Sequence, residues 1–105
     1  MNNYLTLSLD VMSGENDPDA AILGALELLS SRDDIKIILV GNAESIKSKI
    51  TNTDTKRIEI IHTDEIITMD DSPIDALRKK KKSSMRIAVD LVRDNKAQAC
   101  ISSGN

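Results

Sequence analysis

Short apolar runs alternate with helical patterns along this chain, and that alternation limits its fold more than any other feature. Strand-like runs rich in aliphatic residues occur at 4–9, 37–40, 57–63 and 97–105. Helical patterns lie between them at 18–31, 43–50, a stretch opened by Pro73, and 83–95. The predicted order is βαβαβααβ. Helices placed between strands at this spacing imply right-handed crossovers and a doubly wound, mostly parallel α/β sheet.

The two long helices carry features that predict their ends and faces. Pro18 suits the first position of a helix, and Asp17 before it suits the N-cap. One apolar stripe is expected on this helix at Ile22, Ala25, Leu26 and Leu29. On the helix over 83–95 the expected stripe is Met85, Ala88, Val89 and Val92. Ser72 is a candidate cap for the helix that Pro73 opens, and residues 64–72 are predicted to be irregular.

The composition agrees with a sheet that is buried on both faces. The apolar residues are almost all aliphatic, with one Tyr and neither Phe nor Trp, which favours parallel strands covered by helices. A net charge of −3 argues against nucleic-acid binding. The single cysteine, Cys100, fits a reducing cytosol and is expected to be a small core residue in its strand. No signal peptide and no run of about 20 apolar residues is present, so we expect a cytoplasmic protein.

The last strand ends in Ser-Ser-Gly-Asn, where a parallel strand normally leads into a covering helix. We therefore expect residues 1–105 to be the N-terminal part of a single, longer α/β domain, cut after its fourth main strand. The alternative is a complete four-stranded domain.

Polar residues collect where the predicted strands end, at 10–16, 41–42, 62–63 and 102–105. In open parallel sheets, ligands bind outside the carboxyl ends of the strands. Small residues there allow close backbone approach, and helix N-termini offer N–H groups to anions. The pattern predicts one wall of a phosphate- or acid-binding crevice, although any doubly wound protein needs polar turns at these places.

Three stretches together resemble the beginning of a known family. They are LSLDVMSGENDP at 7–18, IILVGN at 37–42 and ALRKKKKSSMRIAVDLVRDNKAQACISSGN at 76–105. The resemblance is to the phosphate acyltransferase family of bacterial phospholipid synthesis, also called the PlsX family. Its first strand runs into Asp-x-Met-Gly-Gly-Asp, a basic helix leads to Ser-Ser-Met, and a later strand ends in Ser-Ala-Gly-Asn-Thr-Gly-Ala. The match covers nearly all of this chain, in the same order, but only about the first third of a family member.

This resemblance implies a fold like that of the isocitrate/isopropylmalate dehydrogenase group, and a reaction. A fatty acyl group passes from acyl carrier protein to inorganic phosphate, and the acyl phosphate feeds a membrane glycerol-phosphate acyltransferase. The resemblance further implies a homodimer that needs no cofactor. Such a protein is expected to be cytoplasmic or peripheral to the inner face of the membrane, and to associate with that acyltransferase. Phosphate is itself the nucleophile, so the reaction requires neither a Ser–His pair nor a metal cluster, and no residue is assigned as catalytic.

The resemblance also suggests binding residues. The predicted substrate or phosphate site comprises Asp10, Gly14, Ser84, Ser103, Gly104 and Asn105. The structural alternatives are a turn-forming Asp10 and a helix cap at Ser83 or Ser84. The cap and the binding role are compatible if one serine caps the helix and the other faces a ligand. His62 ends a strand but has no evident base or ligand partner in the sequence.

A run of five cations precedes the Ser-Ser pair: Arg78, Lys79, Lys80, Lys81 and Lys82. We expect it to dock the acidic carrier protein or to attract phosphate, and the alternative is a solvated helix face.

The chain departs from the family pattern at Ser13-Gly14-Glu15, which replaces Gly-Gly-Asp and adds a Cβ at position 13. The resemblance implies that further catalytic residues lie beyond Asn105. A non-catalytic alternative is therefore a truncated or decaying piece of the enzyme that can only bind or pair. A nucleotide-binding lobe ranks last, because Gly-x-Gly-x-x-Gly does not follow the first strand.

Overall fold

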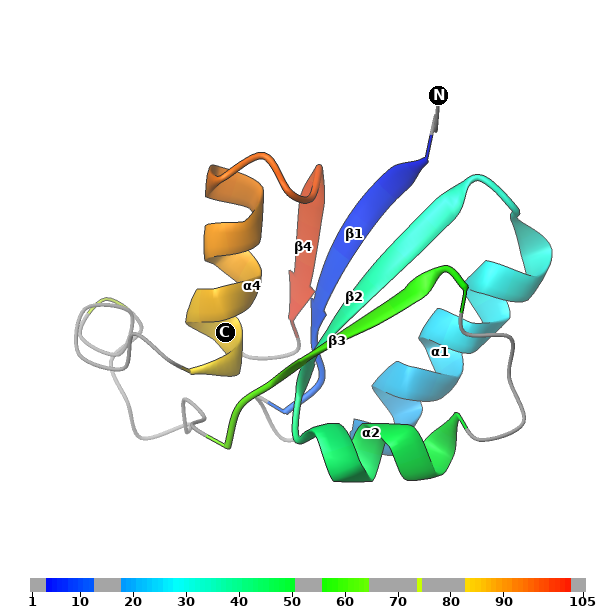
Figure 1. Ribbon diagram of the computed structural model, residues 1–105, viewed down its shortest axis with the longest axis horizontal. Coiled ribbons are helices and arrows are strands. Elements are labelled where there is room, and N and C mark those ends of the chain that lie inside the picture. The colour runs from blue at the N-terminus through cyan, green and yellow to red at the C-terminus, as the bar shows by residue number, and fades with distance from the viewer. Residues whose placement is uncertain (1–3, 13–17, 51–55, 65–73, 75–82, 103–105) are drawn as a thin grey trace.

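A computed structural model of residues 1–105 describes residues 4–12, 18–50, 56–64, 74 and 83–102. Its centre is a parallel four-stranded sheet in the order β3-β2-β1-β4 (Figure 1). The strands are β1 (Leu5–Asp10), β2 (Ile35–Gly41), β3 (Ile58–His62) and β4 (Ala99–Ser102). This arrangement, with helices between the strands, confirms the predicted doubly wound α/β fold.

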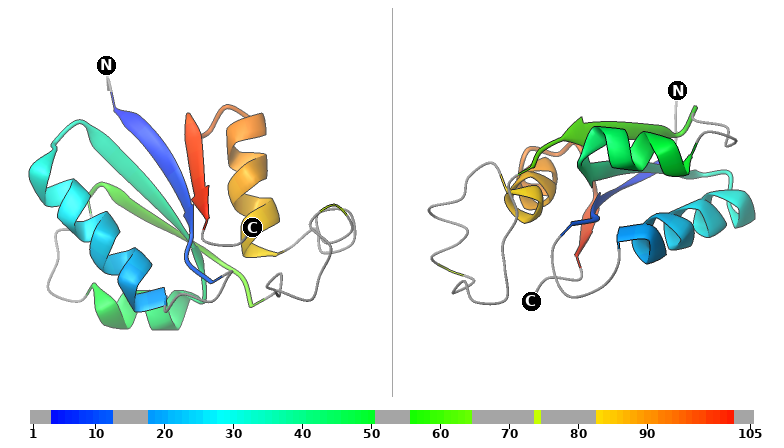
Figure 2. Two further views of the ribbon diagram at one scale, coloured as in Figure 1. Left: turned by 180° about the vertical axis from the view of Figure 1, so that it is seen from behind. Right: turned by 90° about the horizontal axis from the view of Figure 1, so that it is seen from below.

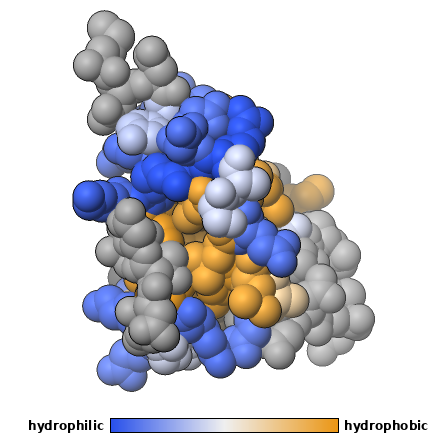
Figure 3. Space-filling view, turned by 90° about the vertical axis from the view of Figure 1, so that its right-hand side faces the viewer, coloured by the Kyte–Doolittle hydropathy of each residue, from blue (hydrophilic) through white to orange (hydrophobic). Residues whose placement is uncertain are grey.

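Helices lie on both faces of this sheet (Figure 2). On one face α1 (Pro18–Ser31) and α2 (Ala43–Lys49) share a core cluster with the sheet, and on the other face α4 (Ser84–Arg93) packs against β1, β4 and β2. Viewed from the right-hand side of Figure 1, hydrophobic side chains gather at the centre of the surface and hydrophilic ones surround them (Figure 3). That side carries α1 and α2.

The position of β2, covered on both faces of the sheet, explains why its sequence is a continuous apolar run. Ile35, Ile37 and Leu39 belong to the core cluster under α1 and α2, whereas Ile38 and Val40 belong to the cluster under α4. Successive side chains of a strand point to opposite faces, so a central strand covered on both sides must be apolar at every position. The strand is longer than the predicted 37–40 because it pairs with β1 on one side and β3 on the other.

The apolar stripe of α1 matches its prediction, and that of α4 matches only in part. On α1 the stripe is confirmed, since Ile22, Ala25 and Leu29 are buried and Leu26 packs against them. On α4 the predicted stripe is partly wrong: Val89 is 39% exposed, and Leu91 is buried in its place. The buried face of α4 therefore differs from the predicted face, and it includes the polar residue Ser84.

Helix α4 has defined ends. Ser83 is its N-cap, with its hydroxyl accepting a hydrogen bond from the N–H of Arg86 at 3.1 Å, so one serine of the pair caps the helix as predicted. After the C-cap Asp94, Asn95 has a φ of 63°, and the N–H of Lys96 bonds back to the carbonyl of Leu91. A left-handed asparagine at this position turns the chain back toward β4.

Cys100 is exposed, which corrects the prediction that it is a core residue. It lies on β4, an edge strand of this sheet, where the side chains have less cover than on β1 or β2.

Several predicted features lie outside the described residues. These are the Asp17 cap, the irregular stretch from 65 to 72 with Ser72, and the helix from Pro73, of which Ile74 alone is described and is helical. Among the helices that are described, none has the length and apolar character needed to cross a membrane.

Candidate functional site

The carboxyl ends of the four strands lie along one edge of the sheet. In the strand register Asp10 lies opposite Val40 on one side and Ser102 on the other, and Gly41 lies opposite His62. The chain leaves β1 through α1 toward β2 and β3, whereas α4 leads to β4 on the other side of β1 (Figure 1). The β1–β4 boundary is therefore the topological switch point, which is where such sheets bind ligands.

Asp10 joins the two strands at this boundary. It is 1% exposed, and one carboxylate oxygen, Oδ2, accepts a hydrogen bond from the Ser102 hydroxyl at 2.7 Å. The other oxygen, Oδ1, accepts from the backbone N–H of Met12 at 3.0 Å. A carboxylate held by two donors fixes the positions where the chain leaves β1 and β4. This geometry favours a positioning role over direct contact with a phosphate, which carries charge of the same sign.

Gly41 allows the end of β1 to pack closely over the end of β2. A Cβ built on Gly41 would lie 2.7 Å from Cγ2 of Val11 and 2.9 Å from Cγ of Met12. The N–H of Val11 also bonds to the carbonyl of Val40 at 3.1 Å, so the chain beyond β1 remains attached to β2. Any side chain at position 41 would push this segment away from the edge.

The N-terminus of α4 lies at the same edge. Ser83 and Ser84 are both fully buried, and the hydroxyl of Ser8 on β1 donates to the carbonyl of Ala88 at 2.8 Å. This bond and the apolar contacts of α4 hold the helix against β1 and β4. Its parallel crossover directs the positive end of the helix dipole toward the carboxyl edge, where it favours a bound anion.

The start of α2 closes another part of the edge with its own side chains. Oδ1 of Asn42 accepts from the N–H of Ser45, while its amide donates to Asp64 at 2.7 Å. His62 Nδ1 accepts from the N–H of Ala43 at 2.9 Å, and its Nε2 lies 3.3 Å from Asp64 Oδ2. The sequence alone offers no evident partner for His62, but here both ring nitrogens are occupied. This histidine therefore organises the β2–α2 turn and has no free nitrogen for use as a base.

Among the described acids, Asp34 has a shifted pKa, and it lies away from this edge. Arg32 hydrogen-bonds the carboxylate of Asp34, just before β2, and lowers its pKa below the ordinary value of 3.8. Within the same residues, His, Cys, Asp and Glu side chains form no group of three that could hold a metal ion.

Three of the six predicted binding residues follow directly from β4. These are Ser103, Gly104 and Asn105; together with Gly14 and the cation run from Arg78 to Lys82, they lie outside the described residues. Asp10 and Ser84 are described, and both lie at the predicted edge. Ser102, Asn42 and His62 were among the predicted strand-end residues, and the structure adds their contacts: the Ser102 hydroxyl engages Asp10, and Asn42, His62 and Asp64 form a network. In the sequence, the only indication of this network is a carboxylate, Asp64, two residues after the histidine that ends β3.

Chemically, this edge combines a helix N-terminus, close-packed backbone at Gly41 and a rigid carboxylate anchor. A family model described as "Fatty acid synthesis protein" matches residues 5–105. The chain belongs to this family.

Curated relatives from several Shewanella strains are similar to this chain, and each is named "Phosphate acyltransferase". The Shewanella baltica OS155 protein is 48% identical over 104 residues, the protein from Shewanella sp. ANA-3 is 46% identical, and that of Shewanella woodyi is 45% identical. Each alignment covers 96% of this chain and 30% of the relative. The chain thus spans about a third of the length of the curated relatives it matches.

Proposed function

We propose that this chain forms one wall of the active-site crevice of a phosphate acyltransferase. In the proposed reaction a fatty acyl group moves from acyl carrier protein to inorganic phosphate, and the acyl phosphate enters phospholipid synthesis. The observation that carries the proposal is the junction of β1 and β4 at the switch point, where Asp10 binds Ser102 beside the N-terminal end of α4. The name "Phosphate acyltransferase" of the relatives supports the transfer of an acyl group to phosphate.

The proposed reaction makes little use of side chains as acids or bases. An oxygen of phosphate attacks the thioester carbonyl, the C–O bond forms, the C–S bond breaks, and the carrier thiolate takes up a proton. The protein must hold a dianion beside the thioester and stabilise the oxyanion that develops on the carbonyl. Backbone N–H groups at strand ends and helix N-termini are suitable donors for both tasks.

Asp10 has a positioning role in this proposal. Its hydrogen bonds with Met12 and Ser102 fix these residues, from which the segments 13–17 and 103–105 continue. Those segments contain the proposed phosphate-binding residues Gly14, Ser103, Gly104 and Asn105. We further propose that the cations at 78–82 dock the acidic carrier protein and that the enzyme acts as a homodimer.

A chimera tests this function directly. Residues 1–105 replace the segment of the Shewanella baltica relative with which they align, and the purified protein receives acyl carrier protein loaded with a fatty acyl group. We expect release of free carrier protein only when phosphate is supplied, with acyl phosphate detected by mass spectrometry. The unmodified relative is the positive control. Equal loss of thioester with and without phosphate, from a chimera that is folded by circular dichroism, contradicts the proposal.

A further inference from the structure

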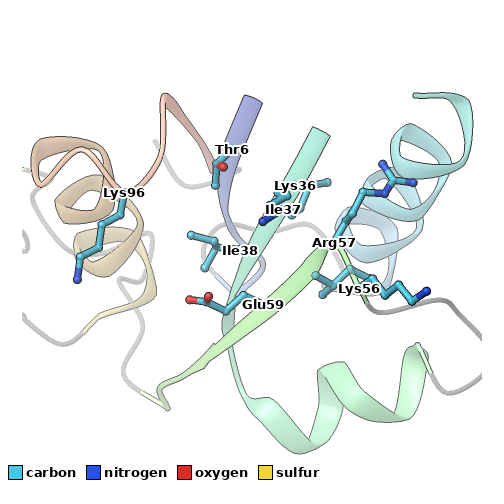
Figure 4. Close-up of a pocket in the computed structure, with 9 residues that line it drawn as sticks. Thr6, Lys36, Ile37, Ile38, Lys56, Arg57, Glu59 and Lys96 are labelled. Carbon is cyan, nitrogen blue, oxygen red and sulfur yellow. The ribbon is translucent and has the colours of Figure 1, made fainter. Parts of the chain in front are cut away.

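A hollow lies at the opposite end of the sheet from the proposed crevice. It has a volume of about 270 Å³ and opens on the face that carries α4, beside the amino-terminal halves of β2 and β3 (Figure 4). Thr6, Ile38 and Glu59 lie in its central part. Helix α4 packs mainly on β1 and β4, so it leaves this part of the sheet uncovered.

Cations surround this hollow, which we call the basic groove. They are Lys36 on β2, Lys56 and Arg57 before β3, and Lys96 after α4, and among the described residues of the lining Glu59 is the one acid. The chain as a whole carries a net charge of −3, so the groove reverses the sign of the surface locally. Such a local excess of positive charge attracts and orients an acidic partner.

Internal contacts give the groove a fixed shape. The guanidinium of Arg57 donates to the carbonyls of Leu29, Arg32 and Ile35 at 2.7, 2.6 and 3.1 Å, which anchors the start of β3 to the end of α1. The ammonium of Lys36 lies 4.7 Å from the ring centroid of Tyr4. Among the described residues, neither Lys36 nor Lys96 has an ion-pair partner.

The distribution of charge distinguishes between possible anions. Lys96 lies on one side of the groove and Lys56 on the other, with the carboxylate of Glu59 between them (Figure 4). A compact dianion such as phosphate would meet this carboxylate at the centre, which costs electrostatic energy. An extended segment can instead place separate carboxylates near Lys96 and Lys36 and keep them away from Glu59.

We propose that the basic groove docks an extended segment of a protein partner that is rich in Asp and Glu. The groove lies at the amino-terminal edge of the sheet, so this site is separate from the phosphate crevice at the carboxyl edge. Docking through exposed lysines is steered by charge and is screened by salt.

The test uses the 105-residue chain and a short fluorescein-labelled oligoglutamate peptide, followed by fluorescence anisotropy. Binding is expected at about 20 mM salt and should weaken markedly at about 150 mM, because exposed charges are screened. Lys96→Glu should weaken binding by about tenfold, because like charges are then brought together. Glu59→Gln should tighten binding by about threefold, since the repulsive charge is removed.

Lys47→Glu is the matched control, since Lys47 is an exposed lysine on α2 outside the groove lining and the charge change is the same. It should change affinity by less than about twofold. Equal effects of the Lys96 and Lys47 substitutions, or no binding at low salt, overturn the proposal. It is also overturned if inorganic phosphate displaces the peptide more strongly than sodium chloride at equal ionic strength, since the groove would then be a small-anion site. Circular dichroism verifies that each variant is folded.

Discussion

Replacing Gly41 by alanine should destabilise the protein, because the end of β1 packs directly over this residue. The new Cβ would lie 2.7 Å from Cγ2 of Val11 and 2.9 Å from Cγ of Met12. Carbon atoms prefer separations of about 3.5–4.0 Å, so one side must move by about 1 Å. Val11 is buried in the α1–α2 core cluster and cannot yield freely. Overpacking of this kind costs about 1–3 kcal/mol in the free energy of unfolding.

Gly24 provides a matched substitution with the opposite expected sign. It lies inside α1, and a Cβ built there meets no atom within 4 Å. Alanine is favoured over glycine in a helix interior by about 0.5–1 kcal/mol. Gly24→Ala should therefore stabilise the protein, and the two alanine variants should differ by about 1.5–4 kcal/mol.

Urea unfolding followed by far-UV circular dichroism measures this difference. All proteins are compared at one concentration, because association would make the apparent stability depend on concentration. The slope of the unfolding free energy against urea should stay the same in all three proteins, which shows that only stability has changed. A Gly41→Ala protein as stable as Gly24→Ala would refute the close packing of β1 over β2 at this edge.

Three further substitutions test other contacts. Ser102→Ala and Asp10→Ala should each cost about 1–3 kcal/mol, and the double variant should fall short of their sum by about 1 kcal/mol, because both substitutions remove the hydrogen bond between the two side chains. Strictly additive costs in urea unfolding would argue against the bond. Arg57→Met should cost about 2–3 kcal/mol, because three backbone carbonyls lose their donor, and an unchanged urea midpoint would show that the anchor is unimportant. For Asp34, NMR titration should give a pKa below 3.8 that returns toward this value in Arg32→Ala. Because the folded-state pKa is lowered, the contribution of this pair is present above the unfolded value and is lost as pH falls through the folded value; an identical Asp34 titration in both proteins would refute the pairing.

The order of elements could be predicted from the sequence because local patterns determine it. The apolar run that ends at Gly41 and the helix that begins at Pro18 carry their signals within a few residues, and both elements are confirmed. The location of Asp10 at the carboxyl edge also followed from the pattern, because all parallel strands end on the same side. The hydrogen bond from Ser102 did not follow, since it joins residues 92 positions apart.

The errors arose where packing between distant elements decides the outcome. The helical pattern around Val89 fits two neighbouring faces, and the sheet beneath α4 selects the face that buries Leu91 and Ser84. A buried serine is not recognisable as part of an inward face when only apolar residues are counted. Cys100 looked like a core residue because its strand is apolar, but its place at an edge of the sheet leaves it exposed.

Kinetics of Asp10→Ala in the chimera test the central claim most directly, with Asp94→Ala at the exposed end of α4 as the control. Loss of the fixed geometry at the strand ends should raise the KM for phosphate by about tenfold or more, because small misplacements at a reacting centre have large effects on binding and rate. The KM for the acyl carrier protein substrate should stay within about twofold of the parent value, because this substrate does not depend on the Asp10 anchor. An unchanged KM for phosphate in a folded Asp10→Ala chimera would contradict the assignment of this edge as the phosphate site.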